Sequence, residues 1–181
     1  NQVLFYALVK RHLKEMIPTI YTPIVGTAVK QFSHEFRRTR GLYIANTNID
    51  QIDDVLANRT NPEIDIIVVT DGEGVLGIGD QGIGGMDIPI AKLMVYSLCG
   101  NINHLRTLPI CLDVGTDNQS LLDDPMYLGL RHQRIRGEAY QAFIERFIKA
   151  VKKAFPWVFL HWEDFGRDSA RMNLDSYRNQ L

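Results

Sequence analysis

Two adjacent carboxylates, Glu163 and Asp164, directly follow the apolar run at residues 157–162, and the Phe165-Gly166 pair after them favours a bend. Neighbouring residues of an extended strand point to opposite sides, so adjacent carboxylates can bind one ion only where the strand ends and the chain turns. Two carboxylates at such a place suit a hard divalent cation that also holds substrate oxygens. A solvated turn is the alternative interpretation of this pair.

Lys92 and Tyr21 both lie beside predicted helix starts. Residues 87–89 predict the first turn of a helix, so Lys92 would lie near its positive end, where the pKa of an amine is lowered and a lysine becomes a candidate base. Tyr21 precedes Thr22-Pro23, a predicted N-cap and first helical residue. Free backbone N–H groups there would favour its phenolate and ease proton donation. An exposed lysine and a core tyrosine are the simpler alternatives.

The stretch VVTDGEGVLGIGDQGIGG, residues 68–85, contains the glycine spacing of a dinucleotide-binding fingerprint at Gly77, Gly79 and Gly82. That fingerprint requires a tight strand-to-helix turn and an acidic residue about 20 positions later. Here Asp71-Gly72 predicts a hairpin, and residues 75–80 form a second β-like run before any helix. No Asp or Glu occurs between residues 88 and 112. A self-contained dinucleotide-binding domain is therefore the less favoured interpretation.

The elements that must position these side chains alternate between apolar strands and helices. Strands are predicted at 41–45, 64–70, 108–114 and 157–162, and the clearest helix is predicted at 137–155, where its apolar stripe ends at Pro156. This alternation predicts an α/β fold, a three-layer α/β/α arrangement with a mostly parallel sheet. An N-terminal helical segment precedes it, with a first helix ended by Pro18 and a second beginning at Pro23. In such sheets ligands gather at the carboxyl ends of the strands.

Composition indicates an ordinary globular protein. The chain has 181 residues, of which 45% are hydrophobic and 23% charged, and its net charge is −1. This balance argues against a nucleic-acid partner, and no apolar run approaches the ~18 residues of a membrane span. Cys99 and Cys111 are too far apart for a metal-binding C-x-x-C pair, so we expect two buried, reduced thiols in a cytoplasmic protein. Both ends of the sequence indicate a domain cut from a longer chain.

Four segments taken together resemble, in this order, the N-terminal region of malic enzymes, particularly the large bacterial NAD-linked type. They are MIPTIYTPIVG, VVTDGEGVLGIGDQGIGGMDIPIAKLMVYSLCG, LPICLDVGTDNQ and HWEDFGRDSARMNLDSYRN. The resemblance covers essentially the whole chain. It implies metal-dependent oxidative decarboxylation of malate to pyruvate and CO2, with Mg2+ or Mn2+ and with reduction of NAD or, as the alternative, NADP. It also implies a homodimer or homotetramer.

The resemblance further implies roles for individual residues. The tyrosine of the family's YTP motif falls on Tyr21, which would protonate the enolpyruvate left by decarboxylation. The lysine of its IPxxKL segment falls on Lys92, which would take the proton of the C2 hydroxyl. The carboxylates of its EDF motif fall on Glu163 and Asp164 as two metal ligands. A third acidic ligand is expected beyond residue 181.

Two positions depart from the family pattern. Gly74 stands where the family has an arginine that contacts malate and cofactor, and loss of such a charge-assisted contact is expected to cost a few kcal/mol. Asp87 stands where the family usually has glycine, and we expect its carboxylate to lie near Lys92 and to raise the pKa of that lysine. A catalytically impaired module for effector binding or assembly is therefore the alternative function.

The expected domain organisation follows from the resemblance and from the helical start of the chain. Residues 1–40 are interpreted as the end of the family's N-terminal helical part, and residues 41–181 as the α/β malic enzyme N-terminal domain. The NAD-binding domain would lie outside this chain. We therefore expect the fragment alone to be inactive.

Overall fold

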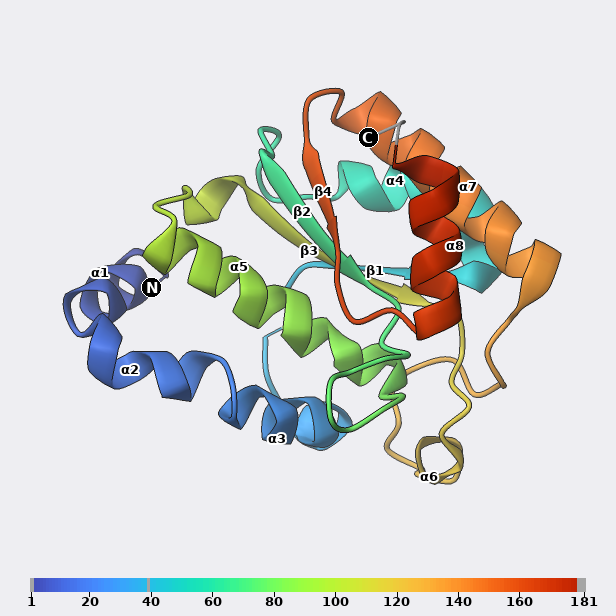
Figure 1. Ribbon diagram of the computed structural model, residues 1–181, viewed down its shortest axis with the longest axis horizontal. Helices are drawn as coiled ribbons and strands as arrows, with labels where there is room; N and C mark the ends of the chain where they lie inside the picture. Colours follow the sequence, from blue (N-terminus) through green and yellow to red (C-terminus); the bar gives the residue numbers. More distant parts are fainter. Residues whose placement is uncertain (1, 39, 179–181) are drawn as a thin grey trace.

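The computed structural model describes residues 2–38 and 40–178. Within them lies a four-stranded sheet in which every neighbouring pair of strands is parallel, in the order β1-β3-β2-β4 (Figure 1). The strands are β1 (Leu42–Ala45), β2 (Ile66–Thr70), β3 (Thr107–Asp113) and β4 (Phe159–Trp162). The predicted α/β class is therefore confirmed.

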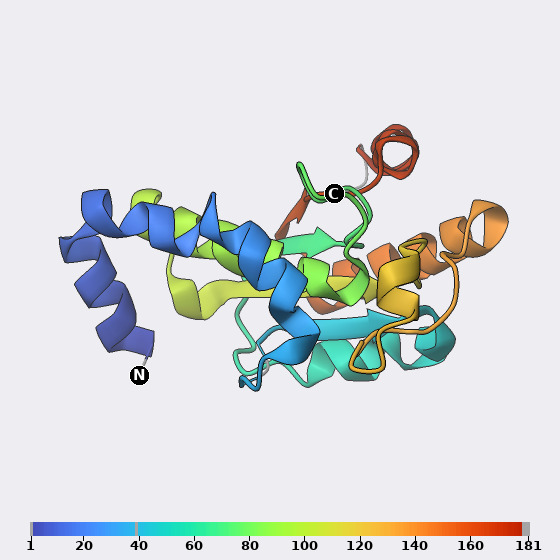
Figure 2. The same ribbon diagram turned by 90° about the horizontal axis from the view of Figure 1, so that it is seen from below.

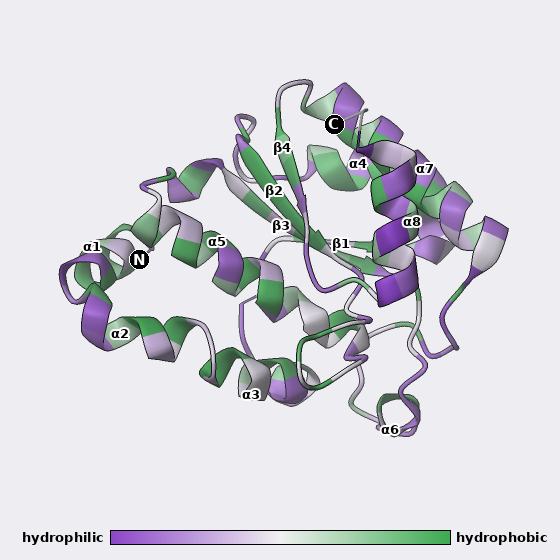
Figure 3. Cartoon of the chain, in the orientation of Figure 1, coloured by the Kyte–Doolittle hydropathy of each residue, from purple (hydrophilic) through white to green (hydrophobic). Residues whose placement is uncertain are grey.

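Helices cover both faces of this sheet. One face packs against α4 (Ile52–Ala57) and α7 (Gly137–Ala154), and the other against α5 (Asp87–Cys99). The largest core cluster lies between the sheet and α7, where Phe143 and Phe147 are almost completely buried. These side chains recur every three or four residues and so form one apolar face of α7, while its polar face is exposed (Figure 3). The three-layer arrangement is thus confirmed.

The N-terminal helices α2 (Leu13–Ile20) and α3 (Ile24–Gln31) run along the outer side of α5, and α1 (Gln2–Arg11) lies at the C-terminal end of α5 (Figures 1 and 2). The predicted end of the first helix at Pro18 is wrong, because the chain breaks at His12 and Pro18 lies inside α2. A proline has no N–H to donate to the carbonyl four positions earlier, and here that carbonyl belongs to Lys14, an exposed residue. The helix can therefore continue.

The start of α3 also differs from the prediction. Its N-cap residue is Pro23, with no side-chain capping bond, so Thr22 is not the cap, and the Thr22-Pro23 peptide is cis. Two of the first N–H groups donate to backbone instead: Val25 to the Tyr21 carbonyl at 3.1 Å and Gly26 to the Pro23 carbonyl at 3.3 Å. This turn places Tyr21 at the junction of α2 and α3.

The predicted β-run at residues 75–80 is a loop. Only one antiparallel bridge forms, between Val75 and Gly79, because the backbone hydrogen bonds between these two residues close a tight turn that leaves no length for a strand. The shorter elements around the sheet are η1 (Phe32–His34), η2 (Asn46–Gln51), η3 (Gly82–Met86), η4 (His104–Arg106), α6 (Gln119–Leu122) and α8 (Arg167–Tyr177). The helix α5 thus follows β2 only after a loop and η3.

The two cysteines differ in their exposure to solvent. Cys111 is buried as expected, but Cys99 is exposed, because it is the last residue of α5 and lies away from the core. Among the described helices, none has both the length and the apolar composition needed to cross a membrane.

Candidate active site

Three of the predicted site residues meet beyond the carboxyl end of β4. The Lys92 Nζ atom lies 2.7 Å from Glu163 Oε1 and 5.1 Å from the centre of the Tyr21 ring. The three residues come from α5, from the first position after β4, and from the turn between α2 and α3. The side chains of Lys92 and Glu163 are 21% and 14% exposed, so their ion pair is partly withdrawn from water. These three side chains therefore lie together at an edge of the sheet where the strand-end rule predicted that ligands gather.

The pKa of Lys92 moves in the direction opposite to the one expected from its place in the helix. Burial alone lowers it, but hydrogen bonds to Glu163 and Tyr21 outweigh burial and hold the pKa well above its usual range. The helix terminus acts only within the first turn, and Lys92 is the sixth residue of α5. In this arrangement Lys92 is an ammonium group, so its proton can leave only when the pair with Glu163 is weakened.

Glu163 has a second set of partners, which the sequence reasoning missed. His161 Nε2 lies 2.7 Å from Glu163 Oε2, and the Tyr96 hydroxyl lies 2.6 Å from His161 Nδ1. Although burial raises the pKa of Glu163, its contacts with His161 and Lys92 outweigh this and lower the pKa. Spacing gives a signal for each residue, since His161 is two positions before Glu163 and Tyr96 is four positions after Lys92 on a helix, but it does not show that the two side chains meet.

Asp164 occupies the bend that the sequence predicted. Its φ of +52° lies in the left-handed region, which Asp tolerates better than most residues, and its carbonyl accepts a hydrogen bond from the Gly74 N–H at 3.0 Å. Burial and the neighbouring Glu163 carboxylate raise the pKa of Asp164. Two adjacent carboxylates at a bend, one of which disfavours the charge of the other, fit a divalent cation. Within residues 2–38 and 40–178, no group of three or more His, Cys, Asp or Glu side chains is placed to hold a metal ion.

Gly74 lies against the turn that carries Asp164. A Cβ atom added to Gly74 would lie 2.4 Å from the Phe165 carbonyl oxygen, a contact with backbone that no side-chain rotation can relieve. Glycine is therefore required for the close approach of loop 71–81 to this turn. An arginine at position 74 could enter only if the loop moved.

We predict that Gly74→Ala lowers the free energy of unfolding by about 1–3 kcal/mol, since overpacking against backbone must displace the loop or the turn. Urea-induced unfolding of the variant beside the wild type measures this. The matched control is Gly26→Ala in α3, where nothing lies within 4 Å of an added Cβ. It is expected to raise stability by about 0.5–1 kcal/mol, the helix preference for alanine. Equal stability of Gly74→Ala and the wild type would contradict the close approach.

The glycine-rich stretch brings backbone segments together and does not form a strand-to-helix turn. A Cβ at Gly72 would lie 2.1 Å from the Gly82 carbonyl oxygen, and one at Gly85 would lie 2.6 Å from the Gly72 Cα. Both Gly72 and Gly82 have positive φ, at +68° and +49°. These contacts fold loop 71–81 back onto η3, so that α5 begins at a fixed place beside the strand ends.

A buried arginine supports the same loop. Arg134 Nε and Nη2 lie 2.7 Å from the two carboxylate oxygens of Asp80, and Nη2 also donates to the Asp71 carbonyl at 2.9 Å. Such a bidentate pair fixes orientation as well as charge. Burial raises the pKa of Asp71 to about 6, against the opposing influence of Arg134. No role was predicted for these residues from the sequence. In the structure Arg134 holds both ends of loop 71–81, the loop that contacts the Asp164 turn.

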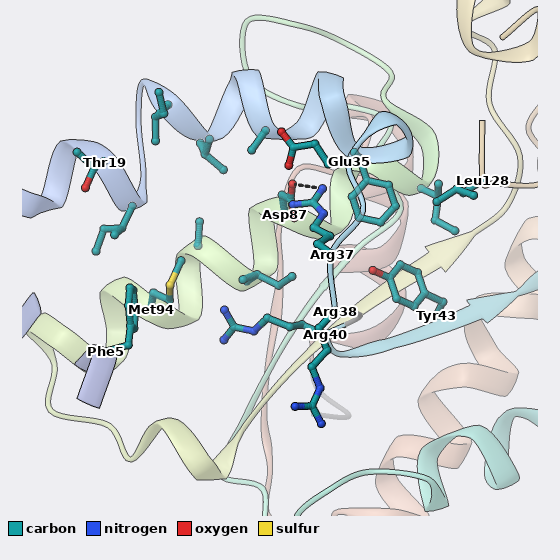
Figure 4. A pocket seen from close by; sticks show the side chains of 18 residues that line it. Phe5, Thr19, Glu35, Arg37, Arg38, Arg40, Tyr43, Asp87, Met94 and Leu128 are labelled. Atoms are coloured by element: carbon teal, nitrogen blue, oxygen red, sulfur yellow. Dashed lines mark ion pairs between the residues drawn. The ribbon is translucent and has the colours of Figure 1, made fainter. Parts of the chain in front are cut away.

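A separate cavity of about 570 Å³ lies between the N-terminal helices and α5 (Figure 4). Its walls are mainly apolar, and Arg37, Arg38 and Arg40 line one side, while Lys92, Glu163 and Asp164 are not among its lining residues. Asp87 lies in this cavity and pairs with Arg37 at 2.9 Å. The expectation that Asp87 acts on Lys92 is therefore wrong, because the helix directs the Asp87 carboxylate toward Arg37, and the pKa of Lys92 is raised by Glu163 and Tyr21 instead.

Comparison with known proteins gives a consistent result. The model of the family described as "Malic enzyme, N-terminal domain" matches residues 1–178. The chain is 55% identical over 181 residues to an NAD-dependent malic enzyme of Edwardsiella ictaluri, covering 100% of this chain and 32% of that protein. It is 54% identical over 180 residues to the NAD-dependent malic enzyme of Shewanella denitrificans, covering 99% of this chain and 32% of that protein. The chain thus spans about a third of the length of these curated relatives.

Proposed function

Because this chain belongs to the malic enzyme family, as its N-terminal domain, we propose that it supplies the malate- and metal-binding part of an NAD-dependent malic enzyme. The reaction proposed for the full-length protein is oxidative decarboxylation of malate to pyruvate and CO2. The observation that carries the proposal is the meeting of Tyr21, Lys92 and Glu163 at one strand end, beside Asp164. The fragment alone is proposed to be inactive, since NAD, or NADP as the alternative, is bound mainly by parts outside this chain.

Lys92 and Tyr21 are proposed to move the two protons of the reaction. Lys92 would first lose its ammonium proton when a bound cation weakens its pair with Glu163. The neutral amine would then take the proton of the C2 hydroxyl as the hydride on C2 passes to the nicotinamide, and Tyr21 would give a proton to C3 of the enolpyruvate that remains after CO2 has left. The two side chains are in contact, so a proton taken up by Lys92 lies beside the group that must later donate one. This proximity supports the assignment of proton uptake to Lys92 and of proton donation to Tyr21.

Glu163 and Asp164 are the proposed ligands of a divalent cation, Mg2+ or Mn2+, with a third acidic ligand beyond residue 181. Their hard oxygen donors and the raised pKa of Asp164 support this assignment. A cation bound there would polarise the oxygens of malate as a Lewis acid. Glu163 also holds Lys92 in place, so the metal site and the proposed base share one carboxylate.

The remaining proposals rest on the family. We propose a cytoplasmic homodimer or homotetramer with malate and pyruvate as its small-molecule partners, and a division of the chain at residue 40. The alternative function is a catalytically impaired effector-binding or assembly module, and Gly74 favours it. The close contact of Gly74 with the Phe165 backbone excludes an arginine in the present loop conformation. The fold of this chain therefore does not allow the guanidinium that the family has at position 74.

The full-length wild-type protein is expected to form NADH and pyruvate in equal amounts from malate when Mn2+ is present. Measuring both products tests the proposal. A wild type that binds malate without forming NADH, together with a Gly74→Arg variant that does form it, would establish the impaired module instead. The fragment itself is expected not to bind NAD in an equilibrium titration, and binding would favour a self-contained dinucleotide-binding domain.

A further inference from the structure

We propose that Tyr96 and His161 form a positioning pair that fixes the orientation of the Glu163 carboxylate and thereby sets the affinity of the strand-end site for a divalent cation. Neither residue is assigned to bind substrate or metal; both act through Glu163. The inference rests on the proposed function, because it takes Glu163 to be a metal ligand. Tyr96 and His161 would determine how firmly the Glu163 carboxylate is held in the orientation that binds the cation.

The direction of each proton in this pair follows from the chemistry of the acceptor. An ionised carboxylate can only accept hydrogen bonds, so the His161 nitrogen that lies 2.7 Å from Glu163 Oε2 must carry a proton. In a neutral imidazole the other nitrogen is then an acceptor, and it lies 2.6 Å from the Tyr96 hydroxyl, which donates to it. Tyr96 thus selects the His161 tautomer that can donate to Glu163.

Both members of the pair are held by rigid elements. His161 lies within β4, in register with Val68 of β2, and the Glu163 N–H donates to the Val69 carbonyl at 2.9 Å. Tyr96 lies one helical turn after Lys92 on α5, so the same helix presents one group to His161 and another to Glu163. The Tyr96 and His161 rings are also in contact, with centroids 5.8 Å apart. The chain of contacts therefore links α5 to β4 at two points.

The two oxygens of Glu163 have different partners. His161 holds Oε2 and Lys92 holds Oε1, and the His161 side chain is only 23% exposed. A glutamate side chain has several rotatable bonds, and fixing one orientation before a ligand arrives removes the entropy that binding would otherwise have to supply. Outer partners of metal ligands commonly act in this way. The Glu163 carboxylate would therefore already have a fixed orientation when a cation binds.

The test is the dissociation constant for Mn2+ of the full-length protein, measured by electron paramagnetic resonance in the absence of malate. His161→Phe, which keeps an aromatic ring but cannot donate, is expected to weaken Mn2+ binding about 10- to 100-fold. His161→Gln places an amide N–H near the position of Nε2 and should recover most of that loss. His161→Asn reaches only as far as Nδ1, so it should bind Mn2+ as weakly as His161→Phe. Equal effects of the Gln and Asn variants would overturn the proposal.

Tyr96→Phe should weaken Mn2+ binding by a smaller factor, about three- to tenfold, as expected for the loss of one neutral hydrogen bond. Because Tyr96 acts through His161, it should have little further effect in a His161→Phe background. If the effects of Tyr96→Phe and His161→Phe on Mn2+ binding were fully additive, Tyr96 would not act through His161 and the proposal would be wrong. A merely structural role would reduce the number of Mn2+ sites per chain through unfolding but would leave the dissociation constant unchanged.

Matched controls exist elsewhere in the chain. His104→Phe keeps a ring stacked on Tyr6, and Tyr43→Phe removes a hydroxyl from β1; both should leave the Mn2+ dissociation constant unchanged. Glu163→Gln separates the two proposals. If it abolishes Mn2+ binding while His161→Phe has no effect, only the positioning pair fails. If Glu163→Gln leaves Mn2+ binding unchanged, the metal site itself is wrong and the pair fails with it.

Discussion

Replacing Lys92 with methionine is expected to lower kcat of the full-length protein by about 10²- to 10⁴-fold, because a positioned general base contributes an effect of that size. Methionine keeps most of the length and apolar stem of the lysine but cannot carry a proton. The loss should appear in kcat more than in KM for malate, since the proposed base acts during the chemical step. Steady-state kinetics with malate and NAD at saturating Mn2+ measures both constants.

Lys92→Arg distinguishes a base from a fixed charge. A guanidinium keeps the cation that pairs with Glu163, but it does not lose its proton in proteins, so it cannot serve as the base. If Lys92 takes the C2 hydroxyl proton, the arginine variant should be about as impaired as the methionine variant while remaining folded. An arginine variant that retained activity within about tenfold of the wild type would show that the charge alone matters and that the base is another group.

Asp164→Asn is expected to weaken Mn2+ binding at least about 100-fold in the full-length protein, more than the loss of an outer partner of a ligand. Asparagine has the same shape and tolerates the left-handed backbone that Asp164 adopts, with φ of +52°. The substitution therefore removes a negative charge and a ligand oxygen without requiring a new turn. Isothermal titration with Mn2+ gives the dissociation constant directly.

The matched control for Asp164→Asn is Asp168→Asn. Asp168 is an exposed carboxylate in the first turn of α8, four positions after Asp164, and it lies outside the turn that contacts Gly74. Its loss should change Mn2+ affinity by less than about twofold. A similar loss of affinity in both variants would mean that general negative charge attracts the cation, and Asp164 would then not be a ligand.

Much of the fold could be predicted because its determinants are local. The near-continuous apolar runs gave strands close to those observed, and the three- and four-residue apolar spacing of α7 was visible in the sequence. The ends of the N-terminal helices were predicted wrongly because they do not depend on local preference alone. Pro18 and Thr22 were interpreted from single-residue preferences, whereas the observed helix ends depend on which backbone groups find partners.

Part of the candidate site could be predicted from the order of the elements and from short motifs. The order of strands and helices places Glu163, Asp164 and the start of α5 at one edge of a parallel sheet, and a motif resemblance located Tyr21 and Lys92. Their catalytic and metal-binding roles stay predictions. The sequence reasoning missed Tyr96 and His161 because their importance depends on a contact between segments that are 65 positions apart.

The sequence by itself determined the fold class, the family, and the types of side chain available at the strand ends. The tertiary structure alone decided which of those side chains act on one another. Lys92 could have been influenced by its helix terminus, by Asp87 or by Glu163, and only the packing of α5 against β2 and β3 shows that Glu163 lies 2.7 Å away while Asp87 faces Arg37. The physical reason is that electrostatic and hydrogen-bond energies fall steeply with distance and depend on burial, and local sequence specifies neither quantity.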